Sequence, residues 1–392
     1  MATSTTTLTG EVAQLLQQGT VIPAHPLALT SDLKLDERRQ RALTRYYCAA
    51  GVGGVAVGVH TTQFEIHAPE TGLLEPVLAL AAETVAESLR MTPRPFVQIA
   101  GLVGPTAQAT REAALALQYG YDAGLLSLAA LRQASDDELM AHVAAVAEIM
   151  PVMGFYLQPA VGGRVLPHSF WRRMVEIENV VAIKIAPFNR YQTIDVVRAV
   201  AEAGRSDEIA LYTGNDDNIV PDLITDFAFA RQPMSMAQTM AEAVTQGAHA
   251  FHPDNGAHIL YDNHQGNAAP RRIVGGLLGQ WAVWTHAAVQ MLATIHQQRE
   301  RGTLDYPHWL QVGAHLTDAN AAIFDAPNNF RGCLPGIHWI LQQQGLLQGT
   351  WTLNPHEQLS PGQVAELTRV CAMYPHLADD DFVAAHLDEW LR

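Results

Sequence analysis

The chain is long for one domain, at 392 residues, yet 48% of its residues are hydrophobic and only 16% are charged. This composition supplies a large buried core and excludes a disordered chain, and the length fits one α/β barrel with insertions. The formal net charge of -15 excludes nucleic acid as a partner, because nucleic-acid-binding proteins need clustered Lys and Arg.

The expected cellular location follows from what the sequence lacks. No apolar run is long enough to span a membrane, and the first residues lack the basic and apolar regions of a signal peptide. The cysteines at 48, 333 and 371 are far apart and form no CxxC pair, which is typical of reduced thiols. We therefore expect a cytoplasmic protein with no membrane partner.

Eight short apolar runs alternate with helical patterns along the chain. The runs are continuous rather than alternating, which is typical of parallel strands covered on both faces. The predicted strands are residues 21–29, 53–60, 95–101, 123–128, 151–159, 180–186, 208–214 and 272–279. Clear helical patterns lie between them, at residues 36–51, 106–120 and 135–150; in the last, Ser135 and Glu138 have capping-box spacing.

Eight β-then-α units predict a closed (β/α)8 TIM barrel, with an open doubly wound sheet as the competing fold. No GxGxxG follows the first strand, which weakens the dinucleotide-binding form of that competitor. We expect an N-terminal extension at 1–20, the barrel at 21–300 and a C-terminal helical region at 301–392. An insertion at about 228–271 separates the seventh helix from the eighth strand.

Lysine is rare in this sequence, since Lys34 and Lys184 are the only two among 24 basic residues. Lys184 nevertheless stands inside the apolar run VVAIKIA. Arginine stays protonated and cannot form an imine, whereas a desolvated lysine can lose its proton and attack a carbonyl group. Lys184 is therefore a candidate nucleophile. The alternative is a lysine whose stem packs at the strand end while its head reaches water.

Polar side chains gather where the predicted strands end, which is where the active sites of barrel enzymes lie. An amine in an apolar strand, a phenol that can relay protons, and hydroxyls that can bind an anion together suit iminium chemistry on a 2-oxo acid. The residues concerned are His25, His60, Thr61, Thr62, Tyr156, Gln158, Lys184, Thr213, Asn215, Asp216 and Asp217.

Four segments at these strand ends resemble one known family. GVHTTQF, GFYLQP, AIKIA and TGNDD are similar to the GTTGE, YN.P, G.K and G.D motifs of the dihydrodipicolinate synthase / N-acetylneuraminate lyase family, in the same order and on the same strands. The resemblance runs from about residue 21 to 285 and continues weakly beyond. It implies a Schiff-base enzyme of the class I aldolase type, without specifying one reaction.

Carried onto this chain, the resemblance implies three roles. Lys184 would form the imine with the substrate ketone, and Tyr156 would shuttle protons at the bond that is made or broken. Thr61 and Thr62 would hold the substrate carboxylate. The alternatives are a barrel-lining aromatic at Tyr156 and a strand-to-loop turn at the two threonines.

The chain also departs from the family pattern. His60 and Gln63 replace the two glycines of GTTGE, and Ala129 and Ala130 stand where dihydrodipicolinate synthases have two tyrosines. Val161 replaces the arginine that clamps a dicarboxylate in those enzymes. These departures argue against a lysine-pathway synthase.

Two further groups complete the predicted site. Gly214, Asp216 and Asp217 resemble the sialic-acid lyase version of strand seven, where acidic groups receive sugar hydroxyls, although the carboxylates suit a helix cap equally well. His25 and His60 end adjacent strands, and either imidazole could act as a general acid or base in place of the absent tyrosines. The alternative for both is a histidine packed at the barrel rim. We predict His60 as catalytic, and the other four as substrate-binding.

The predicted insertion is rich in groups that bind metals. It holds His249, His252, His258 and His264 with Asp254 and Asp262. Their spacing matches no compact zinc signature, and a connection from helix to strand lies on the barrel face opposite the active site. We expect no metal and no cofactor, and a subunit contact or surface role for this segment.

The sequence therefore predicts a lyase or aldolase that acts on pyruvate or another small-molecule 2-oxo acid through a lysine imine. A dehydratase of a 2-oxo sugar acid would use the same imine and is the close alternative. A catalytically inactive barrel that binds a metabolite is the alternative from another class. We expect a homodimer or homotetramer.

Overall fold

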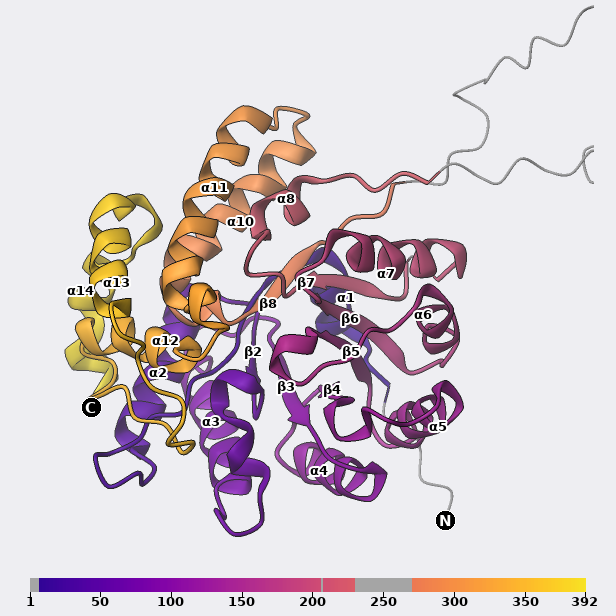
Figure 1. Cartoon of the computed structure of the whole chain (residues 1–392), viewed down its shortest axis with the longest axis horizontal. Helices are drawn as coiled ribbons and strands as arrows, with labels where there is room; N and C mark the ends of the chain where they lie inside the picture. Colours follow the sequence, from indigo (N-terminus) through magenta and orange to yellow (C-terminus); the bar gives the residue numbers. More distant parts are fainter. Residues whose placement is uncertain (1–6, 206, 230–269) are drawn as a thin grey trace, which may run out of the picture. The chain divides into compact units, whose positions relative to one another are not determined.

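The computed structural model describes residues 7–205, 207–229 and 270–392, and eight parallel strands form its centre (Figure 1). Neighbouring strands pair in the order β1-β8-β7-β6-β5-β4-β3-β2, and a parallel bridge between Ala24 and Ala56 joins the two outer strands. The predicted (β/α)8 barrel is confirmed. The strands are β1 Val21–Pro23, β2 Gly54–Val57, β3 Val97–Leu102, β4 Ala123–Leu126, β5 Val152–Leu157, β6 Val180–Ala186, β7 Ala210–Thr213 and β8 Gly275–Leu278.

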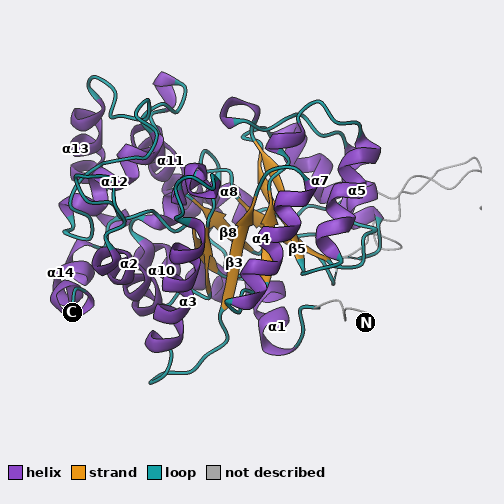
Figure 2. Ribbon diagram, turned by 90° about the horizontal axis from the view of Figure 1, so that it is seen from below, coloured by secondary structure: helices purple, strands orange, loops and turns teal. Residues whose placement is uncertain are grey.

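One helix follows each strand and covers the outside of the barrel (Figures 1 and 2). Ser135 caps its helix as its sequence predicts, because its side chain accepts from the Glu138 N–H while Glu138 reaches back to Ser135. The eight helices are α2 Glu37–Ala50, α3 Leu74–Ser88, α4 Thr106–Gln118, α5 Asp136–Ala147, α6 His168–Met174, α7 Arg190–Glu202, α8 Ile219–Ile224 and α10 Thr285–Glu300.

The amino-terminal end of the barrel is closed by α1, Gly10–Gln18. Leu16 of this helix is buried in the same apolar cluster as the inward-facing residues of the strands. The Tyr212 hydroxyl, on β7, donates to the Leu16 carbonyl oxygen at 2.9 Å. With this end filled, only the carboxyl end of the barrel is available for chemistry.

Four more helices follow the barrel: α11 Tyr306–Ile323, α12 Cys333–Gln343, α13 Gln363–Met373 and α14 Asp380–Trp390. Buried polar contacts attach them to the barrel helices. Asp379 accepts from the Tyr46 hydroxyl at 2.7 Å and from the His286 N–H at 2.9 Å. Figure 2 shows α12, α13 and α14 gathered at one side of the strands. No helix in the described ranges is both long and apolar enough to cross a bilayer.

The chain divides into two compact units, residues 1–225 with 273–392, and residues 226–272. The second unit contains the whole of the predicted insertion at about 228–271. Its histidines 249, 252, 258 and 264, with Asp254 and Asp262, lie outside the described residues.

Candidate active site

Lys184 points into the barrel because of its place in β6. Successive side chains on a strand face opposite sides, and Ala182 and Ala186 belong to the apolar cluster inside the barrel. Lys184 therefore faces inward with them, and its register partner on β5 is Phe155. The Lys184 Nζ atom lies 4.7 Å from the centre of the Phe155 ring, and the residue is only 8% exposed.

Gly214, directly after β7, provides the space that the lysine needs. A Cβ atom at this position would lie 2.6 Å from Lys184 Cε and 2.8 Å from Ala186 Cβ, which are closer than real contacts allow. The Gly214 N–H donates to the Ile185 carbonyl oxygen at 2.7 Å, which fixes the close approach. Gly214 thus serves the site through its missing side chain.

Asp216 lines the same cavity as Lys184. One of its carboxylate oxygens accepts from the Gln280 backbone N–H at 3.1 Å, and its carbonyl oxygen accepts from the Asn320 side chain at 2.7 Å. Gln280 follows β8 and Asn320 belongs to α11, so two separate elements hold Asp216 in place.

The environment brings the pKa values of the amine and the carboxyl group close together. Burial lowers the pKa of Lys184 to about 8, although the Asp216 charge opposes that change. Burial raises the pKa of Asp216 to about 7, against the hydrogen bond from Gln280 and the Lys184 charge. A proton therefore passes between the ammonium and the carboxylate far more readily here than between the same groups in water.

The side chains of the two predicted threonines face different surroundings in the structure. Thr61 lines the cavity, and its hydroxyl makes no hydrogen bond with any described residue. Thr62 faces its own loop, where its hydroxyl accepts from the Gly58 and Val59 N–H groups and donates to the His25 carbonyl oxygen. The strand-to-loop turn is therefore the role of Thr62, and only Thr61 is placed to meet a substrate.

His60 lies at the mouth of the cavity beside Phe64, with ring centres 5.6 Å apart. Burial and the Lys184 charge lower the pKa of His60 to about 4. The imidazole is therefore neutral at pH 7 and can exchange hydrogen bonds there, but it is too weak a base to carry protons efficiently.

Tyr156 and His25 do not reach the cavity, which corrects their predicted placement. Tyr156 is one residue from the inward-facing Phe155, so its side chain points outward; its hydroxyl bonds to the backbone of Leu166 at 3.1 Å. His25 is fully buried against α2, where its ring contacts Thr44 at 2.8 Å. Burial lowers the pKa of His25 to about 4. Both residues pack between strands and helices.

The Asp217 side chain is exposed and does not line the cavity, which differs from its predicted placement in the substrate site. Its carbonyl oxygen accepts from the Thr317 hydroxyl of α11.

Among the described residues, no cluster of three or more His, Cys, Asp or Glu side chains could hold a metal ion.

The roof of the cavity comes from the C-terminal region and was not predicted from the sequence. Phe324, Phe330, Cys333 and Ile337 line the cavity opposite the strand ends. Phe330 meets Phe188 edge to face with ring centres 5.8 Å apart. Only a turn signal marks this segment in the sequence, so nothing local indicates that it folds over Lys184.

Phe330 of the roof and Phe188, which follows β6, both have strained backbones. Phe188 has φ of 53° and Phe330 has φ of 65°, values that bulky residues rarely adopt. The Asn215 side chain accepts from the Phe188 N–H at 3.0 Å, and Asp325 accepts from the Gly332 N–H at 3.0 Å beside Phe330. Such strain costs about 1–3 kcal/mol per residue and persists where the surroundings fix it, often at functional sites.

Gln63 explains one departure from the family pattern. Its backbone is in the left-handed region, with φ of 71°, where a glycine would fit most easily. Its buried side chain accepts from the Leu353 N–H at 2.6 Å. Gln63 thereby ties the loop after β2 to the C-terminal region that forms the roof.

Two cavities at this end of the barrel share three lining residues, and we call them the inner and the outer chamber. The inner chamber, around Lys184, Thr61 and Asp216, has a volume of about 60 Å³. His60, Val161 and Phe330 also line an outer chamber of about 530 Å³. The walls of the outer chamber include Glu65, Arg331, His356 and Glu357.

Comparison with known proteins agrees with this architecture. The profile of the dihydrodipicolinate synthetase family matches residues 18–225, which is more than half of the chain. No curated protein sequence matches the chain.

Solved structures share its fold at low sequence identity. The dihydrodipicolinate synthase from Oceanobacillus iheyensis is 14% identical, with a TM-score of 0.64 over 93% of this chain and 99% of that one. CdNal from Clostridium difficile, solved in complex with mannosamine, is 14% identical, with a TM-score of 0.62 over 91% and 99%. The enzyme from Cyanidioschyzon merolae with lysine bound is 17% identical, with a TM-score of 0.63 over 92% and 99%. Because the family profile covers most of the barrel, this chain belongs to the dihydrodipicolinate synthetase family.

Proposed function

We propose that the protein is a Schiff-base lyase that makes or breaks a carbon–carbon bond next to a small 2-oxo acid such as pyruvate. One observation carries the proposal: a lysine with a depressed pKa and a carboxyl group with a raised pKa line one small chamber. An amine that is unprotonated part of the time can attack a ketone, and a neighbouring acid can supply the proton that the departing oxygen needs.

The size of the inner chamber supports a small substrate. At roughly 10–15 Å³ for each water-sized group, it has room for about four to six such groups. Its walls are mainly apolar, so they suit a short 2-oxo acid and favour the neutral amine. The Thr61 hydroxyl is the group that we assign to the substrate carboxylate.

Asp216 takes the proton-carrying role in this proposal. Lys184 Nζ attacks the ketone carbon, the C–N bond forms, and the former carbonyl oxygen leaves as water with one proton from the amine and one from Asp216, so that a protonated imine remains. In the cleavage direction, the Asp216 carboxylate then removes the proton of the β-hydroxyl group while the carbon–carbon bond breaks. The electrons of that bond move into the imine and give an enamine. His60 remains neutral at the boundary between the chambers, where the leaving aldehyde would pass.

Trapping with borohydride tests the proposal directly. Incubation with pyruvate and borohydride should attach a reduced adduct that peptide mass spectrometry maps to Lys184. Lys184→Ala should abolish it, whereas Lys34→Ala should not, because Lys34 is exposed in a loop. An adduct on Lys34, or no adduct with any member of a panel of 2-oxo acids, would refute the proposed function.

A further inference from the structure

The loop that follows β2 carries His60 and Thr61 of the candidate active site, and a buried histidine closes it. His67, at the end of this loop, is only 6% exposed. Its Nε2 atom lies 2.7 Å from the carbonyl oxygen of Gly58, at the start of the loop. Because a carbonyl oxygen can only accept, Nε2 carries the hydrogen of this bond. His67 thus joins the two ends of the loop.

The Gly58 peptide group is also held by other contacts. Gly101 of β3 packs directly against it, since a Cβ atom at Gly101 would lie 2.0 Å from the Gly58 oxygen. The Gly58 N–H donates to the Thr62 hydroxyl at 3.0 Å. Gly58 is therefore bound at its oxygen by His67 and at its nitrogen by Thr62, the neighbour of Thr61.

Glu112 of α4 contacts the second ring nitrogen of His67. Its Oε2 atom lies 3.1 Å from His67 Nδ1, and its side chain is buried like that of the histidine. With Nε2 committed to Gly58, a hydrogen must lie between Nδ1 and Oε2, because two lone pairs at this distance would repel each other. Glu112 also accepts from the Val103 N–H at 2.9 Å and from the Gln108 side chain at 2.8 Å. The carboxyl group is therefore fixed from β3 and α4 and can orient the imidazole ring.

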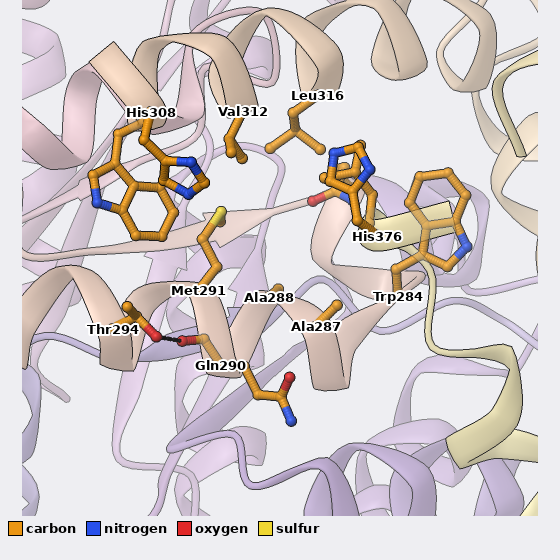
Figure 3. A pocket seen from close by; sticks show the side chains of 13 residues that line it. Trp284, Ala287, Ala288, Gln290, Met291, Thr294, His308, Val312, Leu316 and His376 are labelled. Carbon is orange, nitrogen blue, oxygen red and sulfur yellow. Dashed lines mark hydrogen bonds between the residues drawn. The ribbon is translucent and has the colours of Figure 1, made fainter. Parts of the chain in front are cut away.

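Burial makes these contacts more important than those of a histidine at the surface. His308 and His376, for example, line a cavity of about 290 Å³ between α10 and α11, and both are exposed, so water can complete their hydrogen bonds (Figure 3). Water has little access to His67, and a buried polar atom that loses its partner stays unsatisfied. The contact with Glu112 therefore decides how the His67 ring is oriented.

We propose that His67 and Glu112 are positioning residues of the candidate active site. Glu112 orients the His67 ring, the ring holds the Gly58 carbonyl group, and this contact fixes the turn that presents Thr61 to the inner chamber. Neither His67 nor Glu112 lines that chamber, so neither touches the substrate. The effect on pyruvate rests on the proposed function, in which Thr61 binds the substrate carboxylate.

Two substitutions at Glu112 test whether hydrogen bonding to His67 is what matters. Glu112→Gln keeps a side chain of the same shape, and its amide can donate to Nδ1, so the ring should keep its orientation. Glu112→Leu cannot make this bond, and the ring should lose its hold on Gly58. Gln108→Met is the matched control, because it removes one hydrogen bond of Glu112 and leaves the His67 contact intact.

Amide hydrogen exchange of residues 58–67, followed by mass spectrometry on the full chain, shows whether the loop loosens. Exchange should be about three- to tenfold faster in Glu112→Leu than in the wild type, as the loss of one net hydrogen bond predicts. It should be unchanged in Glu112→Gln and in Gln108→Met. Exchange as slow as in the wild type in Glu112→Leu, or as fast in Glu112→Gln as in Glu112→Leu, would overturn the proposal.

A second variant covers the case in which Glu112→Leu does not fold, since it leaves the Val103 N–H without its acceptor. His67→Phe combined with Glu112→Gln keeps an acceptor for Val103 and leaves no charged side chain without its partner in the core. This double variant removes the bond to Gly58, so its loop should exchange faster by the same factor. A loop that exchanges at the wild-type rate in the double variant would also overturn the proposal.

Borohydride trapping tests the link between the loop and the site. Glu112→Leu should raise the pyruvate concentration for half-maximal trapping about three- to tenfold, with the same maximal rate and the same pH midpoint, because Lys184 is not moved. A loosened loop with an unchanged half-maximal concentration would refute the positioning of Thr61. If the loop loosens as expected while no 2-oxo acid gives an adduct in the wild type, the proposed function fails and the role of His67 and Glu112 in holding the loop stands.

Discussion

Replacing Asp216 by Asn removes a carboxylate that lines the same chamber as Lys184, and it should shift the pH profile of imine formation while lowering the maximal rates of imine formation and turnover. The Asp216 charge opposes the lowering of the Lys184 pKa. Without that charge the amine loses its proton at lower pH, so the midpoint of the pH profile of imine formation should move to lower pH, while the maximal rate of imine formation should fall because asparagine cannot supply the proton that leaves with water. Turnover should fall at the same time, because the asparagine side chain cannot carry the proton.

The size of both effects can be worked out. With a pKa of about 8, roughly one lysine in eleven is neutral at pH 7, against about one in 2,500 for an ordinary lysine. Two unit charges 4 Å apart interact by roughly 1–4 kcal/mol for effective dielectric constants between 80 and 20, and they interact more weakly when they share a chamber at a longer separation. Asp216→Asn should therefore lower the midpoint of the pH profile of imine formation by about 0.5–2 pH units. Loss of a general acid or base costs about 10²- to 10⁴-fold in turnover.

The assay measures initial rates of borohydride trapping and of steady-state turnover for each variant between pH 5 and 10. In the wild type, trapping should rise with pH and level off above the Lys184 pKa, because the neutral amine is the reactive form. Asp217→Asn is the matched control, since this neighbouring carboxylate is exposed and does not line the chamber. A midpoint that rises in Asp216→Asn, or a turnover rate equal to that of the control, would show that Asp216 is not the proton carrier.

Three further substitutions test other parts of the site. Lys184→Met should raise the free energy of unfolding at pH 7 by about 2–3 kcal/mol, because the pKa of the amine is lower in the folded state than in the unfolded chain. In urea titrations this difference should shrink as pH rises from about 8 to 10.4. A difference that is constant with pH would contradict the prediction. Gly214→Ala should lose most of the trapping reaction and about 1–3 kcal/mol of stability, since its Cβ would lie 2.6 Å from Lys184 Cε; unchanged trapping kinetics would mean that the lysine stem adjusts freely. Thr61→Val should raise the pyruvate concentration needed for half-maximal trapping about ten- to hundredfold without lowering stability. Thr62→Val should instead lower the free energy of unfolding by about 1–3 kcal/mol. The opposite pattern would reverse the roles assigned to the two threonines.

Much of the architecture could be predicted from the sequence because it depends on local patterns. Continuous apolar runs and helical periods gave the eight strands and the barrel, and the Ser135 capping box forms as its spacing predicts. Lys184 and Gly214 meet because the ends of parallel strands meet at one rim. The fold class places these two residues next to each other, and the residue type makes the lysine a candidate nucleophile.

Side-chain direction and distant contacts were harder to predict. Tyr156 and Phe155 are adjacent in a strand, so a difference of one residue decides which of them faces Lys184, and motif matching alone chose Tyr156. Thr61 and Thr62 are likewise adjacent, within one turn after β2, and their sequence does not indicate which of the two hydroxyls faces the cavity. Phe330 lies far along the chain from Lys184, and no periodicity relates the two segments.

The roof over Lys184 also has a consequence for how the protein is made. Synthesis proceeds from the amino terminus, so all eight strands leave the ribosome before Phe330, Cys333 and Ile337 exist. At about 5–20 residues per second, the roof segment follows the end of β8 by several seconds. During that interval a nascent barrel would present Lys184 in open water, where its amine regains an ordinary pKa and is protonated. A segment translated after the whole barrel thus completes the burial of the lysine, and a chain released before that segment would carry its amine uncovered.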